Sequence, residues 1–384
     1  MDNTKNNTML FSPYFFLVIG LTLLVYTLLR EAWLMAAAVV IIPFLALYIF
    51  TVLNKPYLGF ITLFTMNYFF IGVLRYINIQ NSSVIMDIFI FFLLTCIFLY
   101  SLCGGKIPWH RANNKLLYIS LIWMTYVFLE LFNPSGMVEA WIFTRTHFYN
   151  FTLLVVLTSL LLNRVQDIKN ILLLLSIFTL IAIGKVLIQR YIGFDAGEKI
   201  WLIQSGSYKT HLLASGTRYF SIFSDAGNFG SNMGMASVIY MILSFYTPRK
   251  GLRYYYRFVS LFAIYALMLS GTRGAMIVPL GGLGMFIILN KNIRYIVTGG
   301  ICLIFIYVFF AHTYILNSNQ QIRRMRTAFH PEKDASYLVR KANQQRLAEY
   351  MVHKPFGEGV GLAGGENRRF SVRFTTQIPT DSHF

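Results

Sequence analysis

Arg273 lies between two long, mostly apolar runs, residues 255–269 and 275–289. Its planar guanidinium pairs with carboxylates and phosphates through two parallel hydrogen bonds at any physiological pH. A permanent charge in such surroundings has two ordinary explanations. Either the side chain extends to the water at a membrane surface, or it lines a substrate pathway on which other polar groups converge. Gly271 and Gly274 flank it in the turn SGTRG, which we expect to reverse the chain tightly between two helices.

Two further regions supply polar side chains that could converge on Arg273. The first, residues 214–234, leads into another apolar run, and the second follows the last apolar run. Together they contribute the candidates Arg218, Asp225, Asn228, Arg346, Asp381 and His383. Arginines of this set would bind an anionic group, and a carboxylate or histidine would take a proton from a hydroxyl group within hydrogen-bond reach.

Most of these candidates also have a purely structural interpretation. Asp225 and Asn228 stand at the start of an apolar run, where either could cap a helix. Arg346 could be a solvated loop charge, and His383 could be an incidental residue near the chain end. The sequence leaves these alternatives open.

The composition indicates that these residues belong to a membrane protein. Of the 384 residues, 56% are hydrophobic and only 12% are charged, whereas soluble domains are about 25% charged. A bilayer core of about 30 Å needs roughly 20 mostly apolar residues per helix. The pattern predicts an all-α polytopic membrane protein with about 11 transmembrane helices. The expected spans are residues 10–29, 32–53, 57–74, 84–102, 116–132, 148–163, 170–188, 228–246, 256–270, 274–290 and 294–312.

Lysine and arginine collect in alternate short loops, and cytoplasmic loops carry this excess. The basic loops follow the even-numbered spans, as residues 247–257 do, so we expect the N-terminus in the cytoplasm. Two longer connections then lie outside. The expected organisation is helices 1–7 in residues 1–188, an extracytoplasmic loop at 189–227, helices 8–11 in residues 228–312, and a large, irregular extracytoplasmic loop at 313–384.

Several classes of protein are disfavoured. The formal net charge of +18 resides largely in predicted cytoplasmic loops, where membrane topology and anionic lipid explain it, so we expect no nucleic-acid partner. The three cysteines lie in or beside apolar spans, and the seven histidines are far apart, with no HExxH or CxxC. We therefore expect no disulfide framework, no metal site and no cofactor.

Residues 210–384 resemble the O-antigen ligase and O-antigen polymerase superfamily of bacterial envelope proteins. Four segments carry the resemblance in the family's order: an arginine ahead of NFG at 218–230, SGTRG at 270–274, RL followed by PFGEGVG at 346–361, and DSH at 381–383. The family continues into a further helix, making 12. We therefore expect this sequence to end before that helix.

The resemblance implies a glycosyltransferase that moves a glycan from a polyprenyl (undecaprenyl) diphosphate carrier to an acceptor sugar. Because the sequence contains no cluster of metal ligands, we expect this enzyme to be metal-independent. The reaction takes place at the outer face of the bacterial cytoplasmic (inner) membrane. Because the leaving group is a lipid diphosphate, preorganised arginines would stabilise its developing charge. We expect Arg218 and Arg273 to bind and stabilise the diphosphate, Arg346 to be a third contact, and Asp225 and Asn228 to contribute to substrate binding.

The acceptor hydroxyl must lose its proton during transfer. His383 is the expected base, and Asp381 is either a second candidate or a residue that orients the histidine.

Three functions stay open. The expected one is a polymerase of O-antigen, capsule or exopolysaccharide, which adds the glycan to another lipid-linked unit, because the final loop is expected to be irregular and without an accessory domain. A ligase would instead transfer the chain to the lipid A core during lipopolysaccharide biosynthesis. A transporter of lipid-linked glycan is the alternative from another class, although its polar site would lie at the bilayer midplane. The expected partners are membrane lipids, a flippase and a chain-length regulator.

Overall fold

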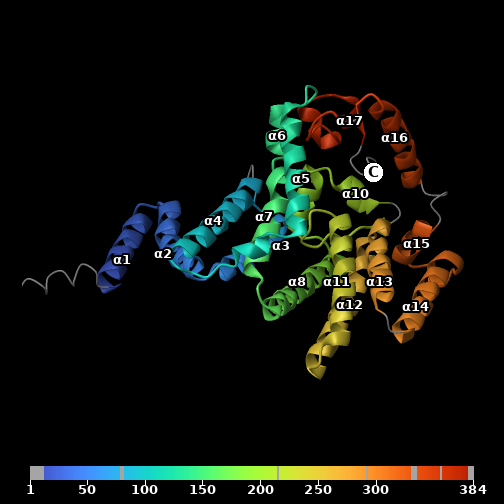
Figure 1. Cartoon of the computed structure of the whole chain (residues 1–384), viewed down its shortest axis with the longest axis horizontal. Coiled ribbons are helices and arrows are strands. Elements are labelled where there is room, and N and C mark those ends of the chain that lie inside the picture. The colour runs from blue at the N-terminus through green and yellow to red at the C-terminus, as the bar shows by residue number, and fades with distance from the viewer. Residues whose placement is uncertain are drawn as a thin grey trace, which may run out of the picture. The chain divides into compact units, whose positions relative to one another are not determined.

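The computed structural model describes residues 13–77, 82–213, 216–290, 293–329, 335–354 and 357–378 of the chain, and most of these residues are helical (Figure 1). The chain divides into two compact units. Unit 1 consists of Met1–Leu63 and Ile88–Trp109, and unit 2 consists of Phe64–Asp87 and His110–Phe384.

Unit 1 contains apolar helices with few buried side chains. Its elements are α1 (Pro13–Leu29), α2 (Trp33–Asn54), the first part of α3 (Pro56–Leu74) and most of α4 (Ser83–Leu102). Gly59 lets α3 approach α4 closely, because a Cβ atom there would lie 2.7 Å from Leu93 Cδ1. Leu34 and Phe44 on α2 are 89% and 70% exposed. Apolar side chains this exposed suit contact with lipid.

Unit 2 contains the later elements and a two-stranded antiparallel sheet with Leu212 opposite Thr217. Before the sheet come η1 (Trp109–Ala112, which begins at the unit boundary), α5 (Lys115–Leu129), η2 (Glu130–Phe132), α6 (Val138–Phe143), α7 (Thr146–Leu161), α8 (Val165–Tyr191), α9 (Ala196–Gln204) and α10 (Tyr208–His211). The sheet and the apolar helices after it are β1 (Leu212–Leu213), β2 (Gly216–Thr217), α11 (Ala226–Tyr246), α12 (Lys250–Ser270), η3 (Arg273–Met276), α13 (Ile277–Leu289) and α14 (Ile293–His312). The C-terminal part contains α15 (Gln320–Arg326), η4 (Thr327–Phe329), α16 (Ala335–Met351), η6 (Gly365–Arg369) and α17 (Phe374–Gln377).

Within the described residues, each of the eleven apolar ranges expected from the sequence overlaps a helix. In the described part of the chain, five helical segments are long and apolar enough to cross a membrane: Trp33–Asn54, Pro56–Leu74, Ser83–Leu102, Lys115–Phe132 and Val165–Tyr191. Shorter apolar helices span Val18–Leu29, Arg273–Leu289 and Ile296–His312. The total of 11 or 12 spans stays a prediction.

The final connection is largely helical where the structure describes it, so the expectation of an irregular loop was wrong. It contains α15, α16 and α17, and α16 alone is 17 residues long. Its sequence, ASYLVRKANQQRLAEYM, is rich in residues with high helix propensity, which a search for apolar spans does not detect.

The core of unit 2 is formed by α8, α11 and α12, and α11 also contacts α13, beside which it runs (Figure 1). Tyr240 of α11 stacks on Tyr256 of α12 with ring centroids 5.7 Å apart. The two helices also approach closely at Gly230, where a Cβ atom would lie 2.5 Å from Ser270 Oγ and 3.0 Å from Ala275 Cβ. This contact fixes the turn between α12 and η3, which carries Arg273.

We predict that Gly230→Leu destabilises unit 2. The new side chain would overlap Ser270 and Ala275, and overpacking of this kind typically costs about 1–3 kcal/mol. The matched control is Gly284→Leu on α13, because a Cβ atom at Gly284 has nothing within 4 Å. Thermal unfolding of the purified proteins in detergent should show a lower midpoint for Gly230→Leu than for the control. Equal midpoints would contradict the close packing.

Candidate active site

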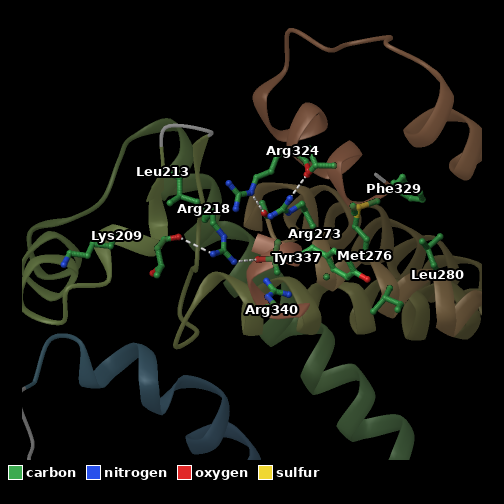
Figure 2. A pocket seen from close by; sticks show the side chains of 17 residues that line it. Lys209, Leu213, Arg218, Arg273, Met276, Leu280, Arg324, Phe329, Tyr337 and Arg340 are labelled. Carbon is green, nitrogen blue, oxygen red and sulfur yellow. Dashed lines mark hydrogen bonds between the residues drawn. The ribbon is translucent and has the colours of Figure 1, made fainter. Parts of the chain in front are cut away.

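A pocket of about 630 Å³ lies beside the segment before α11, the turn after α12 and the start of α13 (Figure 2). Its walls come from α10 and β1, the segment before α11, the turn after α12, η3, the start of α13, α15 with η4, and α16. The sequence regions around Arg218 and Arg273 therefore meet in space. Arg218, Arg273, Thr272 and Gly271 all line the pocket.

The pocket is strongly cationic. Four arginines and one lysine line it, and no aspartate or glutamate is among its described lining residues. The cationic residues are Arg218, Arg273, Arg324, Arg340 and Lys209. An anion is the natural ligand of such an arrangement, because guanidinium groups repel one another until a negative charge lies between them.

Arg218 is held in place by oxygen atoms from two elements. Its Nη1 donates to the Thr210 carbonyl oxygen at 3.2 Å, and its Nη2 donates to Thr272 Oγ1 at 2.9 Å (Figure 2). Thr272 Oγ1 in turn donates to the carbonyl oxygen of Ala226 at 2.9 Å. Arg218, the turn after α12 and the first residue of α11 are thereby joined.

Like charges surround Arg218. Burial lowers the pKa of Arg218, and the nearby guanidinium groups of Arg273 and Arg340 lower it further, whereas Asp225 acts in the opposite direction. Arginine nevertheless keeps its proton in proteins. The three arginines therefore form a group of mutually repelling charges at one place in the fold.

The turn after α12 depends on Gly271, and α15 lies across it. Gly271 ends α12 in the left-handed conformation with φ of 59°, which glycine adopts without strain. Its carbonyl oxygen accepts a hydrogen bond from Arg324 Nε at 2.7 Å, and Arg273 Nη1 donates to Thr327 Oγ1 at 2.7 Å. Gly274, which was also expected to permit the reversal, lies inside η3 without a positive φ. The reversal thus requires only one of the two glycines.

One side of the pocket is apolar. Met276, Ile277, Leu280 and Phe329 line it there, and Ile277 is 73% exposed. Met276 packs in a small core with Phe310 and Met325, which joins η3 to α14 and α15. Cationic and apolar walls thus meet in a single pocket.

Helix α16 contributes Tyr337 and Arg340, and both side chains are exposed. Arg346, the third expected phosphate contact, lies on the same helix but does not line the pocket. At roughly 100° per residue, the nine steps along the helix from Tyr337 to Arg346 place these residues on opposite sides of α16. Arg340, and not Arg346, is therefore the arginine of α16 that lines the pocket.

Asp225 and Asn228 stand at the beginning of α11, as the capping alternative predicts. Asp225 Oδ1 accepts hydrogen bonds from the backbone N–H groups of Gly227 and Asn228 at 2.6 and 2.9 Å. The other carboxylate oxygen accepts from Ser224 Oγ and Asn228 Nδ2. Neither residue lines the pocket, so Asp225 acts on it only through its charge near Arg218.

The two expected proton acceptors, Asp381 and His383, lie outside the described residues. Among the residues that the structure does describe, no group of three or more His, Cys, Asp or Glu side chains is placed to hold a metal ion. The pocket offers guanidinium groups, which bind anions and cannot coordinate a metal cation.

Residues 258–383 match the family model described as O-Antigen ligase. This part of the chain is similar to the O-antigen ligase family. The resemblance drawn from its motifs is therefore confirmed for the C-terminal third. Comparison with curated proteins and with solved structures found no match in either set.

The O-antigen ligase region includes the cationic residues of η3, α15 and α16, while Arg218 precedes it. The family implies glycosyl transfer, with a lipid-linked glycan and an acceptor as substrates. Together with the apolar helices, it indicates a membrane protein.

Sequence reasoning missed Lys209, Arg324, Tyr337 and Arg340. A signal existed for α16, since recognising a helix at 335–351 places Tyr337 and Arg340 on one face at spacing i, i+3. No comparable signal marked Lys209, because its place depends on the fold of the short α10–β1 segment.

Proposed function

We propose that the pocket binds the diphosphate of a polyprenyl-linked glycan, undecaprenyl diphosphate being the expected carrier, and that the protein transfers this glycan to an acceptor sugar. One observation carries the proposal: arginines from four separate segments surround a pocket whose described lining contains no carboxylate. The family match supports glycosyl transfer as the reaction.

The charge of the pocket suits the leaving group. A diphosphate that links a lipid to a sugar bears two negative charges, and it gains a third when the bond to the sugar breaks. Arg218 and Arg273 are fixed by hydrogen bonds before any ligand arrives, so they need little reorganisation as this charge develops. Their guanidinium groups supply the positive charge that metal ions supply at many phosphate sites.

The apolar wall suits the carrier lipid. Ile277 and Leu280 begin α13 directly after the arginine of η3. A prenyl chain attached to a diphosphate at Arg273 would meet these side chains first. The combination of cationic and apolar walls therefore favours a lipid phosphate over a soluble anion.

The transfer step follows from this placement. The acceptor hydroxyl oxygen attacks the anomeric carbon, the bond from that carbon to the phosphate oxygen breaks, and polyprenyl diphosphate leaves. The hydroxyl proton passes to a base, for which we keep His383 and, as a second candidate or orienting partner, Asp381.

The acceptor distinguishes the two transferase types. The preference for a polymerase came from a final connection expected to be irregular and without an accessory domain, and the helices of that connection remove the first of these reasons. The cationic pocket accounts for the donor, which polymerase and ligase share. Transfer to a second lipid-linked glycan would identify a polymerase, and transfer to lipid A core would identify a ligase. A transporter, the remaining alternative, would move the donor without breaking its glycosidic bond.

We further propose that the protein lies in the bacterial cytoplasmic membrane with its N-terminus inside and residues 189–227 and 313–384 outside, as the charge bias of the loops supports. On this topology, a membrane-impermeant thiol reagent applied to intact cells should label Ser205→Cys and leave Lys250→Cys unlabelled. Both variants are made in a parent without the native cysteines. Labelling at position 250 would overturn the topology and the outer location of the pocket.

Arg273→Lys should be nearly as inactive as Arg273→Ala. Lysine keeps the positive charge but loses the planar fork that binds two phosphate oxygens together. Loss of one donor to developing charge typically lowers the rate by about 10²–10³, or roughly 2.7–4 kcal/mol. The measurement is glycan transfer by variants that insert into the membrane at wild-type levels.

Full activity of Arg273→Lys would show that this side chain only reaches the membrane surface.

Purified wild-type protein should also transfer glycan in the presence of EDTA, because the proposal assigns the neutralising charge to arginines. Activity that disappears in EDTA and returns with magnesium or manganese would contradict that assignment.

A further inference from the structure

Helix α16 lines the pocket with side chains that are exposed or half-buried where they are described. Among its described side chains, residues 337–351, none is buried. Leu338 and Val339 are 50% and 58% exposed. A surface helix normally takes its position from an apolar face packed on the core. The contacts at its ends therefore contribute to its position.

The C-terminal end of α16 is fixed by a buried carboxylate. Glu358 is only 6% exposed, and its Oε1 accepts a hydrogen bond from the hydroxyl of Tyr350 at 2.5 Å. Lys354 also pairs with Oε1, and Thr375 Oγ1 donates to Oε2 at 2.8 Å. The ring of Tyr350 packs on Phe374 with centroids 4.8 Å apart. The last turn of α16 is thereby joined to residues 357–378.

Residues 357–378 are in turn seated on the segment between α5 and α7. A Cβ atom at Gly359 would lie 2.7 Å from the Cα atom of Gly136, and one at Gly361 would lie 2.5 Å from the carbonyl oxygen of Ala140. Both glycines also have positive φ, 104° and 82°. The guanidinium of Arg373 donates to the Ser135 carbonyl oxygen. Two glycines of the GEGVG motif thus permit a close backbone contact.

We propose that Glu358 is a positioning residue, which anchors α16 through Tyr350 so that Arg340 reaches the pocket. The inference rests on the proposed function, since it gives Arg340 a role in binding the lipid diphosphate. The proposal also assigns a structural role to the GEGVG motif. Gly359 and Gly361 let residues 357–378 pack on the segment between α5 and α7, and Glu358 holds α16.

A role of Glu358 as the catalytic base fits the structure less well. Burial acts to raise the pKa of Glu358, but hydrogen bonds from Lys354, Tyr350 and Thr375 hold that pKa below its ordinary value. Both carboxylate oxygens are occupied by these donors. A base needs a free oxygen and an affinity for the proton, whereas an anchor needs satisfied hydrogen bonds.

The experiment is a double-mutant cycle between Tyr350→Phe and Arg340→Ala, read as the dissociation constant of undecaprenyl diphosphate for the purified protein. Tyr350→Phe removes the hydroxyl bonded to Glu358 and keeps the ring on Phe374. Each single variant should weaken binding, by roughly tenfold, and the double variant should bind no more weakly than Arg340→Ala. Tyr314→Phe, at a tyrosine that is 82% exposed, is the matched control and should bind as wild type.

A second readout is independent of the ligand. Spin labels at Ile203→Cys and Leu338→Cys, in a parent whose three cysteines are replaced, report the distance between α9 and α16. Both sites are exposed and neither lines the pocket. Tyr350→Phe and Glu358→Gln should each broaden the distance distribution. Unchanged distributions would refute the anchoring role.

The outcomes separate the two proposals. Losses that add in the double variant, or normal binding by Tyr350→Phe, would refute the positioning role while Arg340 keeps its place in the site. Undiminished binding of undecaprenyl diphosphate by Arg218→Ala and Arg273→Ala would refute the proposed function instead. The distance measurement would then still decide whether Glu358 anchors α16.

Discussion

Repulsion among guanidinium groups is the constraint on which the rest of the structure depends. Arg218, Arg273 and Arg340 lie close enough for the last two to lower the pKa of the first. Such a group would separate if its members were on flexible loops. The fold instead holds Arg218 and Arg273 through hydrogen bonds to hydroxyl and carbonyl oxygens, which orient the two guanidinium groups. An anionic ligand between the guanidinium groups would reduce their repulsion.

Several layers of packing support this arrangement. Gly230 allows α11 to approach the turn after α12, Thr272 joins that turn to Arg218 and to α11, and Arg324 holds the turn from α15. The cationic wall is thus assembled from segments far apart in the sequence, each positioned by a different contact. The apolar wall needs no additional element, because the exposed first turn of α13 forms it.

Much of this could be predicted from the sequence, and the limits have physical reasons. Apolar runs of helical length located eleven helices, because hydrophobicity is a local property. Arg218 and Arg273 were found because each stands beside a motif that a family shares. Arg346 was named and Arg340 was missed, because a motif identifies residues without giving the face of the helix on which they lie. Tyr337 and Arg340 line the pocket because of the helical phase of α16, and Lys209 lines it because of a tertiary fold that no local pattern encodes. Asp225 was expected to bind substrate but caps α11, because the same residue types serve at helix caps and in binding sites.

The most direct test of the account is a cryo-electron microscopy structure of the protein with undecaprenyl diphosphate in a lipid nanodisc. The account predicts diphosphate density between Arg218, Arg273 and Arg340, with phosphate oxygens about 2.7–2.9 Å from the guanidinium nitrogens. The first prenyl units should lie against Ile277 and Leu280. A diphosphate bound elsewhere, with this pocket empty or filled only by water, would contradict the central claim.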